Sequence, residues 1–293
     1  MSVNGSTPDE ELVAAYVLDA VGTVRRRDKL ALVRNLQNFQ ESIQRIPHTK
    51  ADLDRAARRV TEIRRAGFHA LCLTDPSYPR LLKAAPDPPF VLSIWGRLDP
   101  EDALGIAIVG ARRATRYGLE MCERLSSDLS AAGLTIVSGL ARGIDGAAHR
   151  GALEAGGRTI AVLGSGLSNL YPREHRRLAS RIADHGAVIS ELDLSEPPNG
   201  RNFPRRNRII TGMTLGTLVV EAARKSGSLV SARIAMEQNR DVFAVPGPAR
   251  APNSEGVHDL IRDGAKLVTD ANDVLDEMRS DVRELLSTRR TEP

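Results

Sequence analysis

The chain has 293 residues, of which 41% are hydrophobic and only 3% aromatic, so its core must consist mainly of alanine, valine, leucine and isoleucine. This length is enough for one large domain or two smaller ones. The formal net charge of +4 is mildly basic and does not by itself indicate a nucleic-acid partner, because the clustering of charge matters more than its sum.

Neither a membrane span nor a metal site is predicted. No apolar run approaches the roughly 20 residues that cross a bilayer, and the first residues lack the basic-then-apolar order of a signal peptide. The two cysteines, Cys72 and Cys122, have no second cysteine or histidine at metal-ligand spacing. We therefore expect a cytoplasmic protein whose thiols are reduced and mostly buried.

Residues 1–70 are predicted to form a small helical domain. In the stretch 49–68, apolar residues recur at helical spacing, Thr49 or Asp52 is expected to cap the helix, and Gly67 is expected to end it. The outer face of this stretch is rich in arginine. A solvated helix face is the favoured interpretation, and a contact with DNA is the alternative.

Residues 71–104 are predicted to be a proline-rich connector that contains the first strand, over residues 90–96. Pro86, Pro88 and Pro89 exclude a continuous helix here.

From residue 105 to residue 278 the pattern changes to short apolar runs, rich in β-branched residues, that alternate with helical stretches. The runs cover residues 105–111, 133–140, 158–166, 186–192, 216–223 and 241–247. They do not alternate polar with apolar residues, so both of their faces should be buried. This pattern predicts an α/β fold, an extended Rossmann-like parallel sheet with helices on both faces.

The segments that follow these runs share glycine, serine and arginine. Ligands of an open parallel sheet bind beyond the carboxyl ends of its strands. Glycine lets a phosphate approach the backbone, helix N-termini offer N–H groups, and arginine forks onto phosphate oxygens. We therefore expect a phosphate-bearing ligand at this edge. The residues concerned are Arg112, Arg113, Ser138, Gly139, Arg142, Gly164, Ser165, Gly166, Ser226, Gly227 and Ser228.

The stretch "NFPRRNRIITG", residues 202–212, is expected to place Arg205, Arg206 and Arg208 in one short turn with no acid among them. Guanidinium groups this close repel one another, so an anion is expected between them. Phe203 could stack on a base, although a core position is the favoured interpretation, and Asn207 is expected to fix the turn.

Two signatures of nucleotide binding are absent. The first loop of the sheet is not G-x-G-x-x-G, and no G-x-x-x-x-G-K-[ST] occurs anywhere in the chain. A dinucleotide-dependent enzyme or a P-loop ATPase is therefore not expected, and no cofactor is predicted.

With these blocks laid out, the chain resembles the DNA-processing protein A family, also called DprA or Smf. The resemblance covers about residues 71–276, and several blocks in the right order make a chance match implausible. They are "VGARRATRYG", "VSGLARGIDGAAHRGALEAGGRTIAVLGSGLSNLYP", "SELDL", "NFPRRNRIITG", "VVEAARKSGSLVSARIAMEQNRDVFAVPG" and "GVHDLIRDGAKLV".

The resemblance implies a Rossmann-like domain that binds single-stranded DNA and helps to load the RecA recombinase onto it in natural transformation, as a homodimer and without a nucleotide cofactor. It implies DNA contacts at Arg112, Ser138, Gly139, residues 164–166 and residues 203–208. It also suggests dimerisation through residues 256–268, where the apolar residues are Leu260, Ile261 and Leu267.

The sequence departs from the family pattern in several places. Ala111 stands where the family usually has serine, which removes a possible phosphate hydroxyl, and His258 stands where asparagine is usual. Residues 1–70 match the family's helical domain only weakly. Many members carry a C-terminal winged helix, and the tail at residues 279–293 is too short to form one.

An enzyme is the alternative to a binding protein. The expected fold is similar to that of nucleotide-5′-monophosphate glycosidases of the lysine-decarboxylase-like family, whose phosphate loop would fall on "KSGSLVSA", residues 225–232. Their catalytic glutamate has no counterpart, because Val230, Ser231 and Ala232 occupy that area and Glu237 lies too far along the helix.

Other candidates for catalysis have commoner structural explanations. Glu191 and Glu221 follow strands and could form a pair, but such acids more often cap helices or orient arginines. Asp145 and His149, at i and i+4, could bind a metal or act as acid and base, but Asp145 also stands where an N-cap is expected. His175 has no evident partner.

The sequence therefore predicts a nonenzymatic single-stranded-DNA-binding protein. A nucleotide-monophosphate hydrolase remains one alternative. An interaction protein of DNA repair or defence with the same groove is another.

Overall fold

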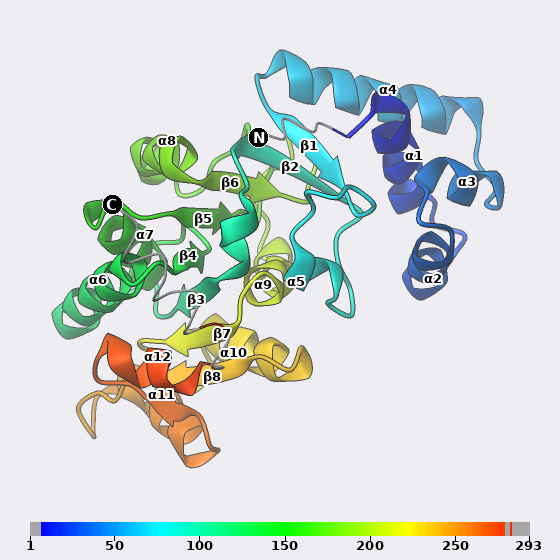
Figure 1. Ribbon diagram of the computed structural model, residues 1–293. Helices are drawn as coiled ribbons and strands as arrows, with labels where there is room; N and C mark the ends of the chain where they lie inside the picture. Colours follow the sequence, from blue (N-terminus) through cyan, green and yellow to red (C-terminus); the bar gives the residue numbers. More distant parts are fainter. Residues whose placement is uncertain (1–6, 279–281, 283–293) are drawn as a thin grey trace.

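In the computed structural model, which describes residues 7–278 and residue 282, one sheet of nine strands runs through the middle of the molecule (Figure 1). The strand order is β1-β2-β6-β5-β4-β3-β7-β8-β9. The strands are β1 (His69–Cys72), β2 (Val91–Gly96), β3 (Gly105–Val109), β4 (Thr135–Ser138), β5 (Thr159–Val162), β6 (Ala187–Ser190), β7 (Gly216–Val219), β8 (Asp241–Ala244) and β9 (Lys266–Leu267).

The strands from β6 to β9 in this order are all parallel, as the sequence predicted for residues 105–278. β2 pairs antiparallel with β6, and β1 pairs antiparallel with β2. β1 is a strand that the sequence analysis did not identify. It crosses the boundary predicted at residue 70, and it extends the sheet beneath the N-terminal helices.

Helices cover both faces of the sheet (Figure 1). They are α1 (Asp9–Ala20), α2 (Arg26–Leu36), α3 (Phe39–Gln44), α4 (Lys50–Arg65), α5 (Arg80–Lys83), α6 (Arg116–Ala131), α7 (Ile144–Glu154), α8 (Arg176–His185), α9 (Asn202–Gly212), α10 (Gly227–Glu237), α11 (Pro252–Arg262) and α12 (Ala271–Glu277), with short 3₁₀ turns η1 (Pro100–Ala103) and η2 (Arg173–His175). Within the described ranges, no helix combines the length and apolarity that crossing a membrane requires.

The core has two layers because successive side chains of a strand point to opposite faces. In β3, Ile106 and Ile108 pack with α6, α7 and α12, whereas Ala107 and Val109 pack on the other face with α9 and α10. Every residue of β3 is buried. This explains why the strand sequences are continuously apolar and confirms the expected sheet with helices on both faces.

The N-terminal part is helical, and α4 begins and ends where the sequence indicates. The Thr49 side chain accepts the Asp52 N–H, and Asp52 reaches back to the Thr49 N–H, which forms a capping box. Gly67 follows the helix with φ 78°, a conformation that glycine adopts without strain. The short helix α1 packs against α3 and α4, and its buried side contacts β1.

Residues 202–212 form the helix α9 rather than the short turn that the sequence analysis expected. Pro204 is the third residue of this helix, and the first turn of a helix tolerates proline because its N–H would lack a helical partner there. Ile209 and Ile210 are buried against the sheet. Asn207 therefore lies inside a helix and does not fix a turn.

Candidate nucleic-acid interface

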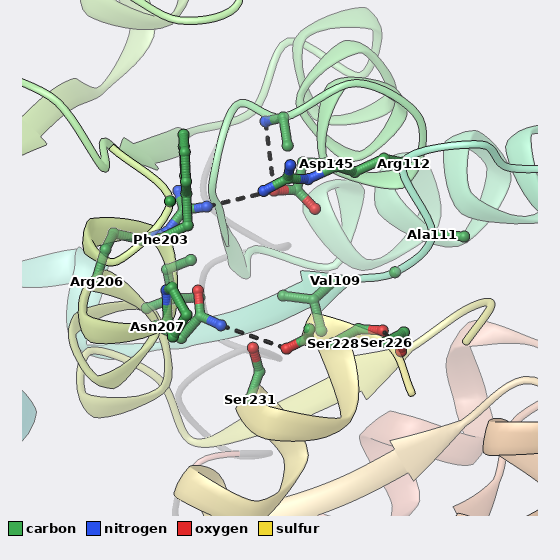
Figure 2. A pocket seen from close by; sticks show the side chains of 16 residues that line it. Val109, Ala111, Arg112, Asp145, Phe203, Arg206, Asn207, Ser226, Ser228 and Ser231 are labelled. Atoms are coloured by element: carbon green, nitrogen blue, oxygen red, sulfur yellow. Dashed lines mark hydrogen bonds and ion pairs between the residues drawn. The ribbon is translucent and has the colours of Figure 1, made fainter. Parts of the chain in front are cut away.

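A cavity of about 400 Å³ opens at the carboxyl edge of the sheet. Ligand cavities commonly have volumes of about 300–1,000 Å³. Figure 2 shows that its walls come from segments far apart in sequence: the end of β3, the start of α7, the helix α9 and the start of α10. The lining residues are Val109, Gly110, Ala111, Arg112, Ala141, Asp145, Gly200, Phe203, Pro204, Arg206, Asn207, Ile210, Ser226, Gly227, Ser228 and Ser231.

Arg206 forms the floor of this cavity and is only 5% exposed. Its Nη1 donates to the carbonyl of Gly139, at 2.6 Å, and to the carbonyl of Val162, while its Nη2 lies 4.0 Å from the carboxylate of Asp145. Burial lowers the pKa of Arg206 to about 10, although Asp145 opposes that shift. Arg206 therefore ties α9 to the ends of β4 and β5 from inside the protein.

Gly139 is required by this arrangement, because a Cβ at that position would collide with the guanidinium of Arg206. The sequence analysis placed Gly139 among the phosphate-contacting residues. The structure places it under Arg206 and outside the cavity lining.

The other two arginines of α9 have acidic partners supplied by distant segments. Arg208, 11% exposed at its side chain, pairs with Glu191 and lies 3.2 Å from a carboxylate oxygen of Asp87. Arg205, half exposed, has Nη2 3.4 Å from the same Glu191. The expectation that an outside anion must separate these guanidinium groups is therefore wrong for Arg206 and Arg208, because the fold brings in the acids that the local sequence lacks.

Exposed Arg112 lies against the half-buried Phe203 on the cavity wall. The guanidinium carbon of Arg112 lies 4.9 Å from the centre of the Phe203 ring, and the Tyr171 ring lies 5.7 Å from it. A Cβ on Gly164 would lie 2.7 Å from the same ring. The absence of a side chain at Gly164 therefore lets the Phe203 ring pack directly on the Gly164 backbone. Phe203 is half-buried, which is intermediate between the core position and the stacking position that the sequence left open.

The start of α10 faces the cavity with hydroxyl and amide groups (Figure 2). Ser226 precedes the helix without capping it through its side chain, and its hydroxyl lies 2.7 Å from that of Ser228. A Cβ on Gly227 would meet nothing within 4 Å, so the backbone there is open. The amide of Asn207 donates to the Gly227 carbonyl at 3.4 Å. A helix N-terminus with this open approach suits an anion.

The remaining small residues lie beneath the cavity. Ser138 is buried and donates to the Ile108 carbonyl at 2.6 Å, so its hydroxyl points inward. Ser165 is also buried, and its carbonyl accepts the Ser190 hydroxyl at 2.8 Å. A Cβ on Gly166 would collide with the backbone of residues 193–194. These residues allow close packing and do not line the cavity.

Two predicted arginines flank the cavity. Arg113 is exposed in the same loop as Arg112. Arg142 is exposed and donates to Glu174 at 2.5 Å, an ion pair that joins the loop after β4 to η2.

The sequence analysis missed the contribution of Asp145 to this site. Its carboxylate lies at the cavity floor beside Arg206, and burial raises its pKa while Arg206 lowers it. No local signal indicates this pair, because the two residues are far apart in sequence. The N-cap of α7 is Gly143, with φ 73°, so the expectation that Asp145 caps this helix is wrong. Asp145 instead accepts the Ala141 N–H at 3.4 Å.

The other possible catalytic groups have structural partners. Glu221 accepts the Thr115 N–H at 2.9 Å and the Thr115 hydroxyl at 2.5 Å, which fixes the start of α6. His149 faces Thr159, with Nδ1 2.7 Å from the hydroxyl, and burial lowers its pKa to about 3. His175 Nδ1 lies 2.9 Å from the Leu140 carbonyl. The described residues contain no cluster of three or more possible metal ligands.

Comparison with known proteins agrees with these features. Residues 69–279 match the family model of DNA recombination-mediator protein A. The Smf protein of Escherichia coli K12 is 48% identical over 212 residues, which are 72% of this chain but 57% of that protein. The DNA processing protein DprA of Streptococcus pneumoniae is 44% identical over 210 residues, or 72% of this chain and 74% of that protein.

Two solved structures share the fold. The X-ray structure of DprA from Streptococcus pneumoniae has a TM-score of 0.77 and 35% identity, and it covers 94% of this chain and 99% of its own. DNA processing protein A from Helicobacter pylori, a protein with a single-stranded DNA binding mode, has a TM-score of 0.64 and 28% identity, covering 75% of this chain and 96% of its own. From the matched family model and these identities, the chain belongs to the DNA recombination-mediator protein A family.

Proposed function

We propose that this chain is a nonenzymatic protein that binds single-stranded DNA along the carboxyl edge of its sheet. The observation that carries the proposal is the cavity wall on which Arg112 lies over Phe203 and faces the open start of α10. The Helicobacter pylori relative, with its single-stranded DNA binding mode, supports the same ligand.

The chemistry of the edge suits a flexible strand. Arg112, Arg113 and Arg205 are exposed and can each approach a phosphate, while the backbone around Gly227 can donate N–H groups. The Phe203 ring offers a surface for a base, a contact worth roughly 1–3 kcal/mol. Because these groups do not distinguish one base from another, binding should be largely nonspecific and should weaken with salt.

The proposal is tested by filter binding to single- and double-stranded oligonucleotides across a salt series. We expect the double variant Arg112→Gln, Arg205→Gln to bind the single strand more weakly. Each lost phosphate contact should reduce the slope of log K against log salt by about 0.7. Arg58→Gln with Arg65→Gln is the matched control, because both arginines are exposed on α4 and the charge change is equal. Unchanged affinity of the first variant would reject the site.

A nucleotide-5′-monophosphate hydrolase is the second candidate, because Asp145 is a carboxyl group with a raised pKa on the cavity floor. Against it, Arg206 and the Ala141 N–H already engage this carboxylate. If the protein released free base from nucleoside monophosphates and Asp145→Asn abolished this release, the hydrolase would be established. If no free base appeared and the protein bound the single strand, the nonenzymatic binding protein would be supported and the hydrolase rejected.

The chain is also proposed to form a homodimer through residues 256–268. Leu267 is 48% exposed on β9, which is the edge strand of the described sheet. Leu260 and Ile261 on α11 are half-buried against the core, so Leu267 offers the cleaner test. Light scattering should show a dimer that Leu267→Arg converts to a monomer. A monomeric wild-type protein at micromolar concentration would contradict the interface.

The cellular role that we propose is to protect incoming single strands in the cytoplasm and to help load RecA onto them in natural transformation or recombination. The match to a family of recombination mediators supports this role. RecA filament formation on a pre-coated single strand should be faster with this protein than without it. An equal rate would favour a role in DNA repair or defence that does not involve RecA.

A further inference from the structure

Four arginines on η2 and α8 are not used by the site described above. Arg173, Arg176, Arg177 and Arg181, here called the α8 arginine row, are all exposed. None of them has an ion-pair or side-chain hydrogen-bond partner among residues 7–278. The nearby Glu174 pairs with Arg142 instead. The apolar side of α8 packs on the sheet through Ala179, Ile182 and Ala183, so the row points to solvent.

The row contrasts with the exposed arginines of α6. Exposed arginines of α6 pair with acids one turn away, as in Arg116–Glu120 and Arg124–Asp128. In the row, Arg173, Arg177 and Arg181 follow one another at intervals of four residues. Arg177 and Arg181 share α8, where like charges at this spacing destabilise a helix by a few tenths of a kcal/mol. Glu174, three residues before Arg177, and Asp184, three residues after Arg181, form no ion pair with the row among the described residues, so its guanidinium groups stay available to an outside anion.

The row begins at the rim of the cavity. Tyr171, whose ring lies 5.7 Å from that of Phe203, is two residues before Arg173. The His175 contact with the Leu140 carbonyl, at 2.9 Å, and the ion pair of Glu174 with Arg142 hold η2 against the loop after β4. From there α8 leads away from the edge, and its rise of 1.5 Å per residue spreads Arg176 to Arg181 over about 7.5 Å.

We infer that the α8 arginine row is a second tract for the same DNA strand, which leaves the cavity past Phe203 and Tyr171 and follows the outer face of α8. This inference rests on the proposed function. A polymer with regularly spaced phosphates can contact guanidinium groups distributed along a helix, whereas a single small anion could contact only one or two. The tract adds affinity for long strands through phosphate contacts alone.

The test compares a short oligonucleotide of about three nucleotides, which can occupy the cavity but is too short to follow α8, with one of about thirty nucleotides. The long strand exceeds the about 4–16 nucleotides of a single compact site. In the triple variant Arg176→Gln, Arg177→Gln, Arg181→Gln, binding of the long strand should weaken. Its salt slope should decrease by about 2, because each of the three lost phosphate contacts contributes about 0.7. Binding of the short strand should stay unchanged. The corresponding lysine variant keeps the charges and should bind both strands like the wild type.

The matched control is Arg45→Gln, Arg58→Gln, Arg65→Gln. It removes the same charge from exposed positions after α3 and on α4 that have no ion pairs in the described structure. The melting temperature checks that each variant is folded. If the α8 variant binds both strands like the wild type while the Arg112, Arg205 variant is weakened, the tract is refuted and the proposed function stands. If it weakens both lengths equally, or if the control loses as much affinity, the separate tract is also refuted. If the wild type binds neither strand, the proposed function fails and the tract with it.

Discussion

Replacing Arg206 should damage the fold more than the electrostatics of the DNA site, in contrast to replacing its neighbour Arg205. In Arg206→Met, the carbonyls of Gly139 and Val162 and the carboxylate of Asp145 lose their common partner in a buried place. Leaving a buried polar group unpaired costs about 1–3 kcal/mol, and removing one member of a buried ion pair costs about 3–5 kcal/mol. We expect a loss of about 3–5 kcal/mol in the free energy of unfolding.

Arg205→Met provides the comparison on the same helix. Arg205 is half exposed, and its ion pair with Glu191 is long, at 3.4 Å. Partly exposed pairs contribute about 0–1 kcal/mol, so this variant should be nearly as stable as the wild type. Its affinity for a single strand should fall, and its salt slope should decrease by about 0.7.

Urea unfolding measures the first effect, and salt-dependent strand binding measures the second. The folded fraction of Arg206→Met should bind the single strand with the wild-type salt slope, because a buried arginine that joins α9 to β4 and β5 does not neutralise a phosphate. Arg206→Lys should have intermediate stability, since an ammonium group cannot reproduce the fork that reaches two carbonyls. Suppose that Arg206→Met lost less than about 1 kcal/mol in the free energy of unfolding and lowered the salt slope of strand binding. Arg206 would then be a phosphate ligand, and its structural role would be refuted.

Two further outcomes are expected from the same geometry. Gly139→Ala should lower the melting temperature, because its methyl group displaces the buried Arg206. Gly227→Ala should leave the melting temperature nearly unchanged, because its Cβ points into open space. Equal melting temperatures of the two variants would contradict the packing of Gly139 against Arg206. Burial lowers the pKa of His149 to about 3, below the ordinary value of 6.5, so the unfolded chain binds the proton first as pH falls. Between pH 6.5 and about 3, the unfolding free energy should therefore drop by up to about 1.4 kcal/mol per pH unit from this residue. His149→Gln should have a correspondingly shallower pH dependence in urea unfolding, and equal slopes would show that His149 is not buried as a neutral ring.

His149 also shows how a spacing can suggest the wrong partner. Asp145 and His149 share a helix at i and i+4, which is compatible with a metal site. In the structure, the Thr159 hydroxyl donates to the Ile136 carbonyl at 2.7 Å and so accepts from Nδ1 of His149. Burial lowers the pKa of the ring to about 3, so near neutral pH the ring carries one proton, on Nδ1, and it faces β5 rather than Asp145. A contact across elements overrides the local pairing.

The sequence alone determined the parallel strands, the edge at which glycine, serine and arginine gather, and the family. These features are local: a strand buried on both faces must be continuously apolar, and its carboxyl end must lead into a loop that can approach a ligand. For the same reason, the cavity wall around Arg112, Phe203 and Ser226 was predictable from the residues that follow each strand.

Only the tertiary structure decided which arginines remain free for a ligand. Three guanidinium groups in one segment look alike in sequence, yet Arg206 and Arg208 are engaged by groups from other strands and loops, whereas Arg205 is half exposed. It also decided that β1 joins the sheet antiparallel to β2 and that Asp145 lies at the cavity floor. The physical reason is that burial and charge pairing depend on distances between residues far apart along the chain, which a local pattern does not specify.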